Sequence, residues 1–421
     1  MNNSTPPSPL ATDDQRKAEK LALRLIEDPR IRAAREEARA TLRADKVAAL
    51  PDGYLGLDRA LDQWILALTM RCINADPWRP KVLWNVYNAP RYWFGHVYAG
   101  AAVAIDNPDN SNREISVDGD SAYIIHGRFG KPATQFMIEI VVDFDHYAGI
   151  GRTLSALTTQ NIVSDTDGNF TITIDSQLAH GRVNHLQSAA GKLNWMFMRD
   201  SMADWRQNIT TLRVERTAGP PALPERTEDE IVGDIVTSMP VWVEFWRGFK
   251  DDFLGYPEPN RLVGPNGRPG GWGFLSGGRF HISGGQAVVI TVTDGDANYT
   301  GCQISDPWTI SPDPVTRLAS LNKSQILPNP DDSITYVLAA RDPGVHNWID
   351  TVGLLDGWMM LRWQGVPATT DPATLVRSIK TVNLDDLASA LPAGTPQATL
   401  ASRSAQIARR IAEFAVRFVE E

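Results

Sequence analysis

Residues 336–364 place side chains capable of acid–base chemistry between two apolar runs of the chain. The runs at 336–340 and 358–363 are bounded by Asp, Pro and Gly, which is typical of buried strands. Because loops held by a rigid sheet often carry binding and catalytic groups, we expect one wall of a site here. The alternative interpretation is a purely structural turn, since Asp342-Pro343-Gly344 is ordinary turn chemistry. The polar and aromatic residues between the runs are Asp342, His346, Asn347, Trp348 and Asp350.

The predicted catalytic groups are a carboxylate base and a partner that protonates or stabilises a leaving oxygen. Burial among tryptophans would raise a carboxyl pKa toward a useful range, whereas a nearby arginine would lower it. The candidate bases are Asp342 and Asp350, and the candidate partners are Tyr123, Lys323 and His346.

The predicted substrate contacts come from four stretches of the second half of the chain. Asparagines would hold a developing oxyanion, and aromatic rings would hold the substrate. For Arg362, an ion pair with a loop aspartate is the alternative interpretation. The predicted contact residues are Tyr299, Gln303, Trp308, Asn322, Asn347, Trp348 and Arg362. A second candidate region consists of the turns at 107–110 and 118–120, which are also interpretable as plain hairpin turns.

Familiar cofactor and nucleophile motifs are missing from the sequence. His180 and His185 are five residues apart with no HExxH pattern, although a three-histidine site assembled from distant strands stays open. The glycine-rich run 264–278 lacks the Gly-Lys-Ser/Thr ending of a phosphate loop and is interpreted as a surface or lid loop. Because no Gly-x-Ser-x-Gly elbow is present either, the sequence predicts chemistry without a metal or cofactor.

Composition narrows the class of protein. A net charge of −9 argues against a nucleic-acid surface, and no run approaches the ~18 apolar residues of a membrane span. Cys72 and Cys302 are the only cysteines, which favours a reducing compartment and a cytoplasmic protein. The expected partner is a small aromatic substrate beside some of the 13 tryptophans, and assembly into a homo-oligomer stays open.

Changes in residue pattern along the chain predict an α+β protein with two antiparallel β-sandwich or jelly-roll-like regions. Helices would precede, separate and follow these regions, with a break at Pro29 and a kink or split at Pro240. The predicted segments are a disordered tail (1–13), a helical region (14–90), a first β domain (91–217), a linker and helix (218–257), a second β domain (258–370), and a C-terminal segment with an amphipathic helix (371–421).

The two predicted β regions resemble each other at two places. Residues 167–170 open a strand that is followed downstream by Asn194-Trp195. Residues 331–334 open another strand, followed by Asn347-Trp348. This similarity predicts an internal duplication.

Four blocks of the sequence also resemble a known family. The segments 104–130, 299–308, 320–325 and 341–365 are similar to bacterial proteins carrying the domain of unknown function 1214, and the resemblance runs from about residue 76 to residue 365. It implies a strand-rich, jelly-roll-like C-terminal domain, in bacteria that degrade aromatic or alicyclic compounds. It supplies no catalytic motif to carry over.

By elimination and by the habitat of that family, the expected function is a cofactor-independent lyase in aromatic catabolism. One concrete version is the retro-aldol-type release of formaldehyde from a lignin-derived aromatic dimer. The alternatives are a non-catalytic protein that binds carbohydrates or aromatic compounds, and a carboxylate-based or metal-dependent hydrolase.

Overall fold

Three helices begin the chain in the computed structural model, which describes residues 7–145, 147–149 and 151–419. They are α1 (Asp13–Leu25), α2 (Pro29–Arg43) and α3 (Pro51–Ile73), with a 3-10 turn η1 (Lys46–Ala49) before α3. The predicted break at Pro29 is confirmed, because Asp28 caps α2 and Pro29 is its first residue. Proline suits that position since its missing N–H has no partner in the first turn of a helix.

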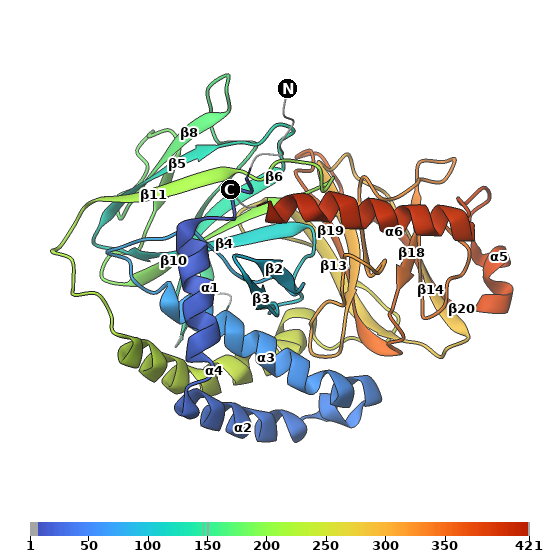
Figure 1. Cartoon of the computed structure of the whole chain (residues 1–421). Helices are drawn as coiled ribbons and strands as arrows, with labels where there is room; N and C mark the ends of the chain where they lie inside the picture. Colours follow the sequence, from blue (N-terminus) through green and yellow to red (C-terminus); the bar gives the residue numbers. More distant parts are fainter. Residues whose placement is uncertain (1–6, 146, 150, 420–421) are drawn as a thin grey trace.

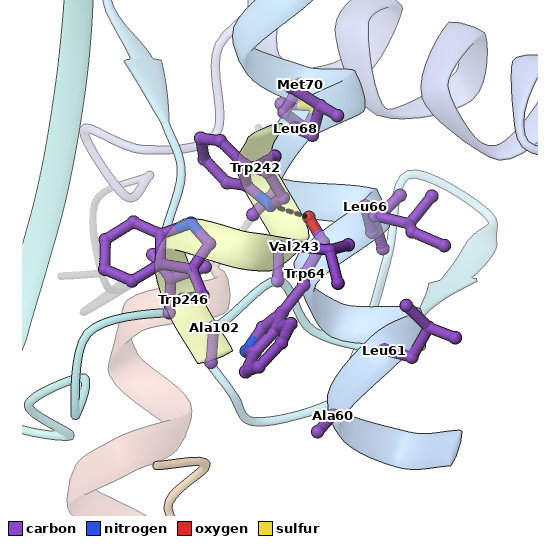
Figure 2. Close-up of a cluster of buried hydrophobic side chains, with 14 of the residues drawn as sticks. Ala60, Leu61, Trp64, Leu66, Leu68, Met70, Ala102, Trp242, Val243 and Trp246 are labelled. Atoms are coloured by element: carbon purple, nitrogen blue, oxygen red, sulfur yellow. Dashed lines mark hydrogen bonds between the residues drawn. The ribbon is translucent and has the colours of Figure 1, made fainter. Parts of the chain in front are cut away.

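Helix α4 (Glu228–Leu254) starts at a capping box formed by Thr227 and Glu230 and contains Pro240 in its interior. Of the predicted kink or split at Pro240, the split does not occur, because the helix runs from Glu228 to Leu254 without interruption. Packing against α3 holds the helix together on both sides of the proline, and Trp242 Nε1 donates a hydrogen bond to Trp64 O at 2.9 Å (Figure 2).

The first sandwich consists of a five-stranded and a four-stranded sheet. The larger sheet has the order β1 (Leu83–Trp84), β4 (Asn110–Asp118), β10 (Leu193–Ser201), β6 (Gln135–Val142) and β7 (Arg152–Thr158). The smaller has the order β11 (Thr211–Ala218), β5 (Ala122–Arg128), β8 (Asn169–Asp175) and β9 (His185–Gln187). Alternate residues from both sheets, such as Ile115, Ile125, Ile138 and Ile172, form one core.

The second sandwich is built in the same way. Its larger sheet has the order β12 (Val263–Gly267), β13 (Gly273–His281), β19 (Asp356–Gln364), β15 (Tyr299–Ser305) and β16 (Ser320–Asn322). Its smaller sheet has the order β20 (Val376–Asn383), β14 (Gln286–Val292), β17 (Ile334–Ala339) and β18 (Trp348–Asp350). Its core lies between the two sheets as well.

Taken in chain order, the strands of the two sandwiches occupy equivalent places in their sheets, and both contain one parallel pair, β8 with β9 and β17 with β18. The predicted duplication is therefore visible in the topology. The 167–170 and 331–334 segments are equivalent, because they open β8 and β17. The other half of the sequence comparison is wrong: Asn194 lies on β10, whereas the counterpart of Asn347 is Asn184, directly before β9.

The two sandwiches lie side by side with α3 and α4 along one edge (Figure 1). The first sandwich contains a long insertion between β1 and β4 that carries the hairpin β2 (Arg91–Trp93) and β3 (His96–Tyr98). After the second sandwich come η2 (Pro372–Thr374), η3 (Leu384–Asp386), α5 (Leu387–Ala390), α6 (Leu400–Ala415) and η4 (Val416–Phe418). The predicted α+β class with two sandwich regions is confirmed.

The C-terminal helix is present, but the apolar face that its spacing predicts is only partly correct; that face consists of Ile407, Ile411, Phe414, Ala415 and Phe418. Phe414 is buried, whereas Ile411 is 45% exposed. The buried face instead contains Arg403 and Arg410, and the buried Arg417 in η4 continues their seven-residue spacing. Arg410 donates to Pro314 O, and Arg417 donates to Pro108 O. Hydrogen bonds to carbonyls satisfy these buried cations, so hydrophobic spacing alone misplaced the face.

Three predicted segment boundaries also differ from the structure. Strand β1 belongs to the first sandwich although it lies in the region predicted to be helical (14–90). Within the tail, residues 1–6 lie outside the described residues, but Leu10 is 2% exposed and packs in a cluster with Trp84. Strand β20 belongs to the second sandwich although it lies in the segment predicted to follow it. No helix among the described residues has the length and apolar character needed to cross a membrane.

Candidate functional site

A cavity of about 450 Å³ lies where the two sandwiches and α4 meet. Its walls come from the outer faces of β4, β6, β10, β13 and β19, from α4, and from the insertion before β4. Arg152 and Pro269 are lining residues that are also exposed, and they mark the side open to solvent. The cavity therefore depends on elements from residue 71 to residue 364.

Aromatic side chains from three elements form the apolar wall. Phe249 stacks on Phe253 with ring centroids 4.9 Å apart, and Trp246 meets Phe249 edge-on at 5.3 Å. Phe197 on β10 and Trp272 in the β12–β13 turn complete the wall. Because these rings hold one another in fixed orientations, the wall is preorganised for a flat apolar molecule.

Six arginines and three carboxylates border the same cavity. Two of the arginines are paired with lining glutamates: Arg71 with Glu114 at 2.7 Å, and Arg199 with Glu139 at 2.6 Å. Two more are paired with aspartates outside the lining, Arg113 with Asp200 and Arg152 with Asp143. Within the described part of the chain, Arg268 and Arg362 form no ion pair.

Arg268 and Arg362 are held by other contacts. Arg362 donates to Gln303 Oε1 and to Ile105 O. Arg268 lies over the ring of Trp272, with its guanidinium carbon 4.6 Å from the ring centroid. Burial lowers the pKa of Arg268 to about 9, and the positive charges of Arg199 and Arg362 add to the effect. Burial also lowers the pKa of Arg362. A cluster of cations withdrawn from bulk water favours a bound anion.

Asp106 is the lining carboxyl with no arginine partner in the described residues. It is 4% exposed, and burial raises its pKa to about 6, although hydrogen bonds from Ser311 lower it. Oδ1 accepts from the Ser311 hydroxyl at 3.1 Å, while Oδ2 is buried without a protein partner. A carboxyl with this pKa changes protonation state close to neutral pH and is suited to proton transfer.

Three further polar atoms on lining residues are buried without a protein partner: Arg113 Nε, Trp246 Nε1 and Arg268 Nε. Buried polar groups in proteins are normally hydrogen-bonded. Together with Asp106 Oδ2, these atoms supply three donors and one acceptor around a single cavity. Their arrangement suits a ligand with both an apolar body and polar substituents.

Four of the predicted contact residues take part in two groups of hydrogen bonds, one centred on Asp109 and one on Gln303. Asp109 accepts hydrogen bonds from the Tyr299 hydroxyl at 2.9 Å and from Asn322 Nδ2 at 3.1 Å. Gln303 donates to Asp106 O and accepts from Arg362. Burial raises the pKa of Tyr299 well above its usual value, so this phenol stays protonated. Of these four residues, Arg362 lines the cavity, and the other three lie outside its lining. The alternative ion pair of Arg362 with a loop aspartate is not formed.

The predicted bases lie elsewhere, on the side of the second sandwich covered by α6. Asp342 forms an ion pair with Arg403 at 2.9 Å. Arg403 also donates to His346 O, and burial lowers the pKa of the His346 imidazole. Asp350 pairs with Arg317 at 2.6 Å and caps the turn at Val352. None of these residues borders the cavity.

Other predicted site residues have structural contacts. Asn347 Oδ1 accepts from Leu327 N and its Nδ2 donates to Leu327 O, and Asn184 makes the same two bonds with Val163. The repetition of this clamp in both sandwiches indicates a folding role. Trp348 Nε1 donates to Ala339 O.

The remaining three predicted residues also lie away from the cavity lining. The Tyr123 hydroxyl donates to Pro77 O, Lys323 Nζ donates to Ala297 O and pairs with Asp294, and Trp308 Nε1 donates to Gly53 O.

Several lining groups were not predicted. Asp106 directly precedes the turn 107–110, which was the second candidate region and does border the cavity through Asn107 and Asn110. Arg268 and Trp272 belong to the glycine-rich run 264–278, which was interpreted as a surface or lid loop and in fact contains most of β12, a turn and most of β13. The concentration of Trp and Phe in α4 was a signal, but helical spacing does not show which rings face a cavity.

No group of three or more His, Cys, Asp and Glu side chains suitable for a metal ion occurs in residues 7–145, 147–149 and 151–419. The expectation of chemistry without a metal or cofactor stays a prediction.

Of the comparisons with known proteins, the likeness to one solved structure supports the fold. No protein-family model matches the chain, and neither does any curated protein. The chain is similar to the crystal structure of an uncharacterised protein from Burkholderia cenocepacia, with a TM-score of 0.71 and 21% identity over 88% of this chain and 100% of that one. It also matches the VPA0106 protein from Vibrio parahaemolyticus, with a TM-score of 0.40 and 12% identity over 66% of this chain and 90% of that one.

Proposed function

We propose that this protein binds a small aromatic molecule in the cavity between its two sandwiches and exchanges a proton with it through Asp106. The observation that carries the proposal is a buried, unpartnered carboxyl oxygen in a cavity that also has an aromatic wall. The volume of about 450 Å³ lies within the ~300–1,000 Å³ range of small-molecule sites.

The aromatic wall supports recognition of a ring. Phe249, Phe253 and Trp246 contact one another at centroid distances of 4.9 and 5.3 Å, so a bound ring would pack on a surface that is already ordered. The unpartnered Trp246 Nε1 is available to donate to an oxygen substituent of the ligand. Burial of one aromatic ring removes on the order of 150–250 Å² of surface from water, which stabilises the complex.

The proposed reaction class is that of a lyase acting on a hydroxylated aromatic compound. In the retro-aldol version, Asp106 takes the proton of a hydroxymethyl group, and the adjacent carbon–carbon bond breaks to release formaldehyde. The electron pair of that bond expels a neighbouring oxygen substituent, which receives the proton and leaves a conjugated product. A positioned acid–base group typically contributes ~10²–10⁴-fold to such a reaction.

The pKa of Asp106 suits this task. At about 6 it leaves the carboxylate mostly ionised at neutral pH, ready to accept a proton and able to return it. The other lining carboxylates, Glu114 and Glu139, are held in ion pairs. A hydrolase that needs two cooperating carboxyls is therefore less well supported than single-site proton transfer.

A non-catalytic binding protein is the second candidate. It is favoured by the same observation that Asp106 stands alone, because binding requires the wall and the polar atoms but no second acid or base. A measurement of turnover distinguishes the lyase from the non-catalytic binding protein.

The proposed partner is a small aromatic compound, and the proposed compartment is the cytoplasm. Cys72 and Cys302 are both buried free thiols, as suits a reducing environment. A homo-oligomer stays a prediction, as does membership of the family with domain of unknown function 1214.

The test is incubation of the purified protein with a panel of lignin-type aromatic dimers. Formaldehyde release and new near-ultraviolet absorbance report turnover, and quenching of tryptophan fluorescence reports binding. We expect Asp106→Asn to abolish turnover while ligand still quenches the fluorescence. The matched control is Asp342→Asn, which removes a carboxylate outside the cavity and should leave turnover unchanged.

Each outcome decides between the candidates. Saturable quenching without turnover in the wild-type protein would favour the binding protein. Loss of turnover in Asp342→Asn but not in Asp106→Asn would move the base to the second sandwich. A panel that neither quenches nor reacts would overturn the proposed function.

A further inference from the structure

Each sandwich places an arginine at the equivalent position of the cavity wall. Arg199 on β10 and Arg362 on β19 are equivalent in the pairing registers of the two five-stranded sheets. In both cases Nη1 of the arginine donates to Oε1 of the side chain diagonally across the neighbouring strand. That acceptor is Glu139 on β6 in the first sandwich and Gln303 on β15 in the second.

This single difference changes the charge of the cavity. Glu139 neutralises Arg199, whereas the uncharged amide of Gln303 leaves the positive charge of Arg362 in place. Arg268 adds a second unneutralised cation, near enough to Arg362 for the two charges to lower its pKa. Asp106 supplies one negative charge on the same side of the cavity, so a surplus of one positive charge remains.

We propose that the cavity selects an aromatic monocarboxylate, whose carboxylate group binds Arg362 and Arg268 while its ring packs on Phe249, Phe253 and Trp272. The inference rests on the proposed function and names the chemical class of its ligand. Gln303 is the specificity-determining residue, because it holds Arg362 in place without cancelling its charge.

Three features support a carboxylate of single charge. Guanidinium groups match planar carboxylates with two parallel hydrogen bonds, and Arg268 Nε is a buried donor without a partner. A second negative charge on the ligand would exceed the surplus in the cavity and lie near the Asp106 carboxylate. The aromatic wall calls for a ligand with an apolar part, which small inorganic anions lack.

The experiment compares ring carboxylates with their neutral amides. The probe pairs are benzoate with benzamide and biphenyl-4-carboxylate with biphenyl-4-carboxamide, titrated against the full-length protein by calorimetry and by tryptophan fluorescence at neutral pH. Hydrogen bonds to an ionised acceptor are stronger than those to a neutral one, so we expect each carboxylate to bind at least about tenfold more tightly than its amide.

Reciprocal substitutions test whether the residue that accepts from each arginine, Glu139 or Gln303, sets the preference for a carboxylate. Gln303→Glu reproduces the pair of the first sandwich and should remove the tenfold preference for the carboxylate. Glu139→Gln reproduces the pair of the second sandwich, unmasks Arg199, and should raise the affinity for the carboxylate. Arg362→Met tests the same point without adding a buried acid and should also remove the preference. Arg377→Met is the control, because Arg377 lies in an exposed ion pair with Asp331 and outside the cavity lining.

The outcomes separate this inference from the proposed function. Equal binding of carboxylate and amide by the wild-type protein would overturn the monocarboxylate assignment and leave the aromatic cavity standing. Failure of every ring compound to bind would overturn both. A preference that survives in both Gln303→Glu and Arg362→Met, in variants with wild-type circular dichroism, would remove Gln303 and Arg362 from the anion site.

Discussion

In the first sandwich a glutamate beside Arg199 cancels the charge of that arginine, whereas in the second a glutamine beside Arg362 does not. Strand order, register and the atom that accepts the hydrogen bond are the same at both places. A difference of one side-chain group therefore gives two similar scaffolds different electrostatic roles. The first sandwich contributes a neutralised arginine to the cavity wall, and the second contributes an arginine that keeps its charge.

The segments that join the edge strand of each five-stranded sheet to its neighbour, β1 to β4 and β12 to β13, differ more widely in length. In the first sandwich, residues 85–109 between β1 and β4 contribute Asp106 to the cavity, and in the second a turn between β12 and β13 contributes Arg268. Gly270 and Gly271 allow this turn because both have positive φ, 81° and 71°. Loops between strands can vary in length without disrupting the sheet. Here they carry Asp106 and Arg268, which are groups of opposite charge.

Removing the two equivalent arginines should give the largest contrast in stability. Arg199→Met leaves Glu139, whose side chain is 8% exposed, without its partner and should lower the free energy of unfolding by about 3 kcal/mol. Arg362→Met leaves only neutral acceptors unpaired and should cost about 1 kcal/mol. Urea unfolding followed by circular dichroism measures both, and equal losses would mean that Glu139 and Gln303 do not differ in charge state.

The buried carboxyl of Asp106 should make stability depend on pH in a defined window. Its folded-state pKa of about 6 is raised above the usual 3.8, so the folded protein holds this proton more tightly than the unfolded chain. The stability that this proton contributes is fully present below about pH 4 and is lost as pH rises through 6. Relative to the wild type, Asp106→Asn should therefore gain on the order of 3 kcal/mol between pH 4 and pH 7.

Asp306, which follows β15 in the second sandwich, is the matched comparison. Burial raises its pKa to about 7, so the corresponding window of Asp306→Asn should extend to higher pH. Chemical unfolding at a series of pH values tests both variants. A difference from the wild type that is independent of pH would contradict the assignment of a raised pKa to either group.

The equivalent asparagine clamps should differ in strength. Asn347 is 2% exposed and adds a third hydrogen bond, to Thr335 O, whereas Asn184 is 9% exposed and makes two side-chain bonds. We expect Asn347→Ala to lower the free energy of unfolding by about 2 kcal/mol and Asn184→Ala by about 1 kcal/mol. Thermal and urea unfolding give the values. Loss of ligand binding in Asn347→Ala with unchanged stability would instead place Asn347 in a site.

The smallest effect is expected for Asp350, one of the two predicted bases. In the parallel strand pairs its counterpart in the first sandwich is Gln187, so a charge is not required at this position of the fold. Asp350→Asn keeps an acceptor for Val352 N but loses the pair with Arg317, which is 45% exposed, and should cost up to about 1 kcal/mol. Turnover and ligand affinity should equal those of the wild type, and a loss of turnover with intact folding would restore Asp350 as the base.

Local patterns predicted the elements well because they depend on neighbouring residues. The break at Pro29 and the runs at 336–340 and 358–363 correspond to α2, β17 and β19. Pro240 does not split α4, because packing on α3 outweighs the loss of one backbone hydrogen bond. The face of α6 was misjudged because buried arginines that bind carbonyls look like solvent-facing residues in a sequence.

The candidate site was predicted in part. Arg362 was named and borders the cavity, and the turn 107–110 lies next to Asp106. Asp342 and Asp350 were chosen because they stand in a polar loop between strands, but that loop packs under α6 and pairs its carboxylates with Arg403 and Arg317. Nothing in the local sequence distinguishes a carboxylate that has an arginine partner elsewhere in the chain from one that has none.

Hydrophobic alternation, capping and turn residues act over a few positions, so most strands and helices could be predicted from residue patterns, whereas the duplication was matched correctly at only one of its two places. Folding brings β10, β19 and α4 together at one cavity, where Arg199 is neutralised and Arg362 is not, and no local pattern predicts this arrangement. Charge and burial at that cavity depend on groups spread from Arg71 to Gln364, and their distances are set by folding rather than by spacing along the chain.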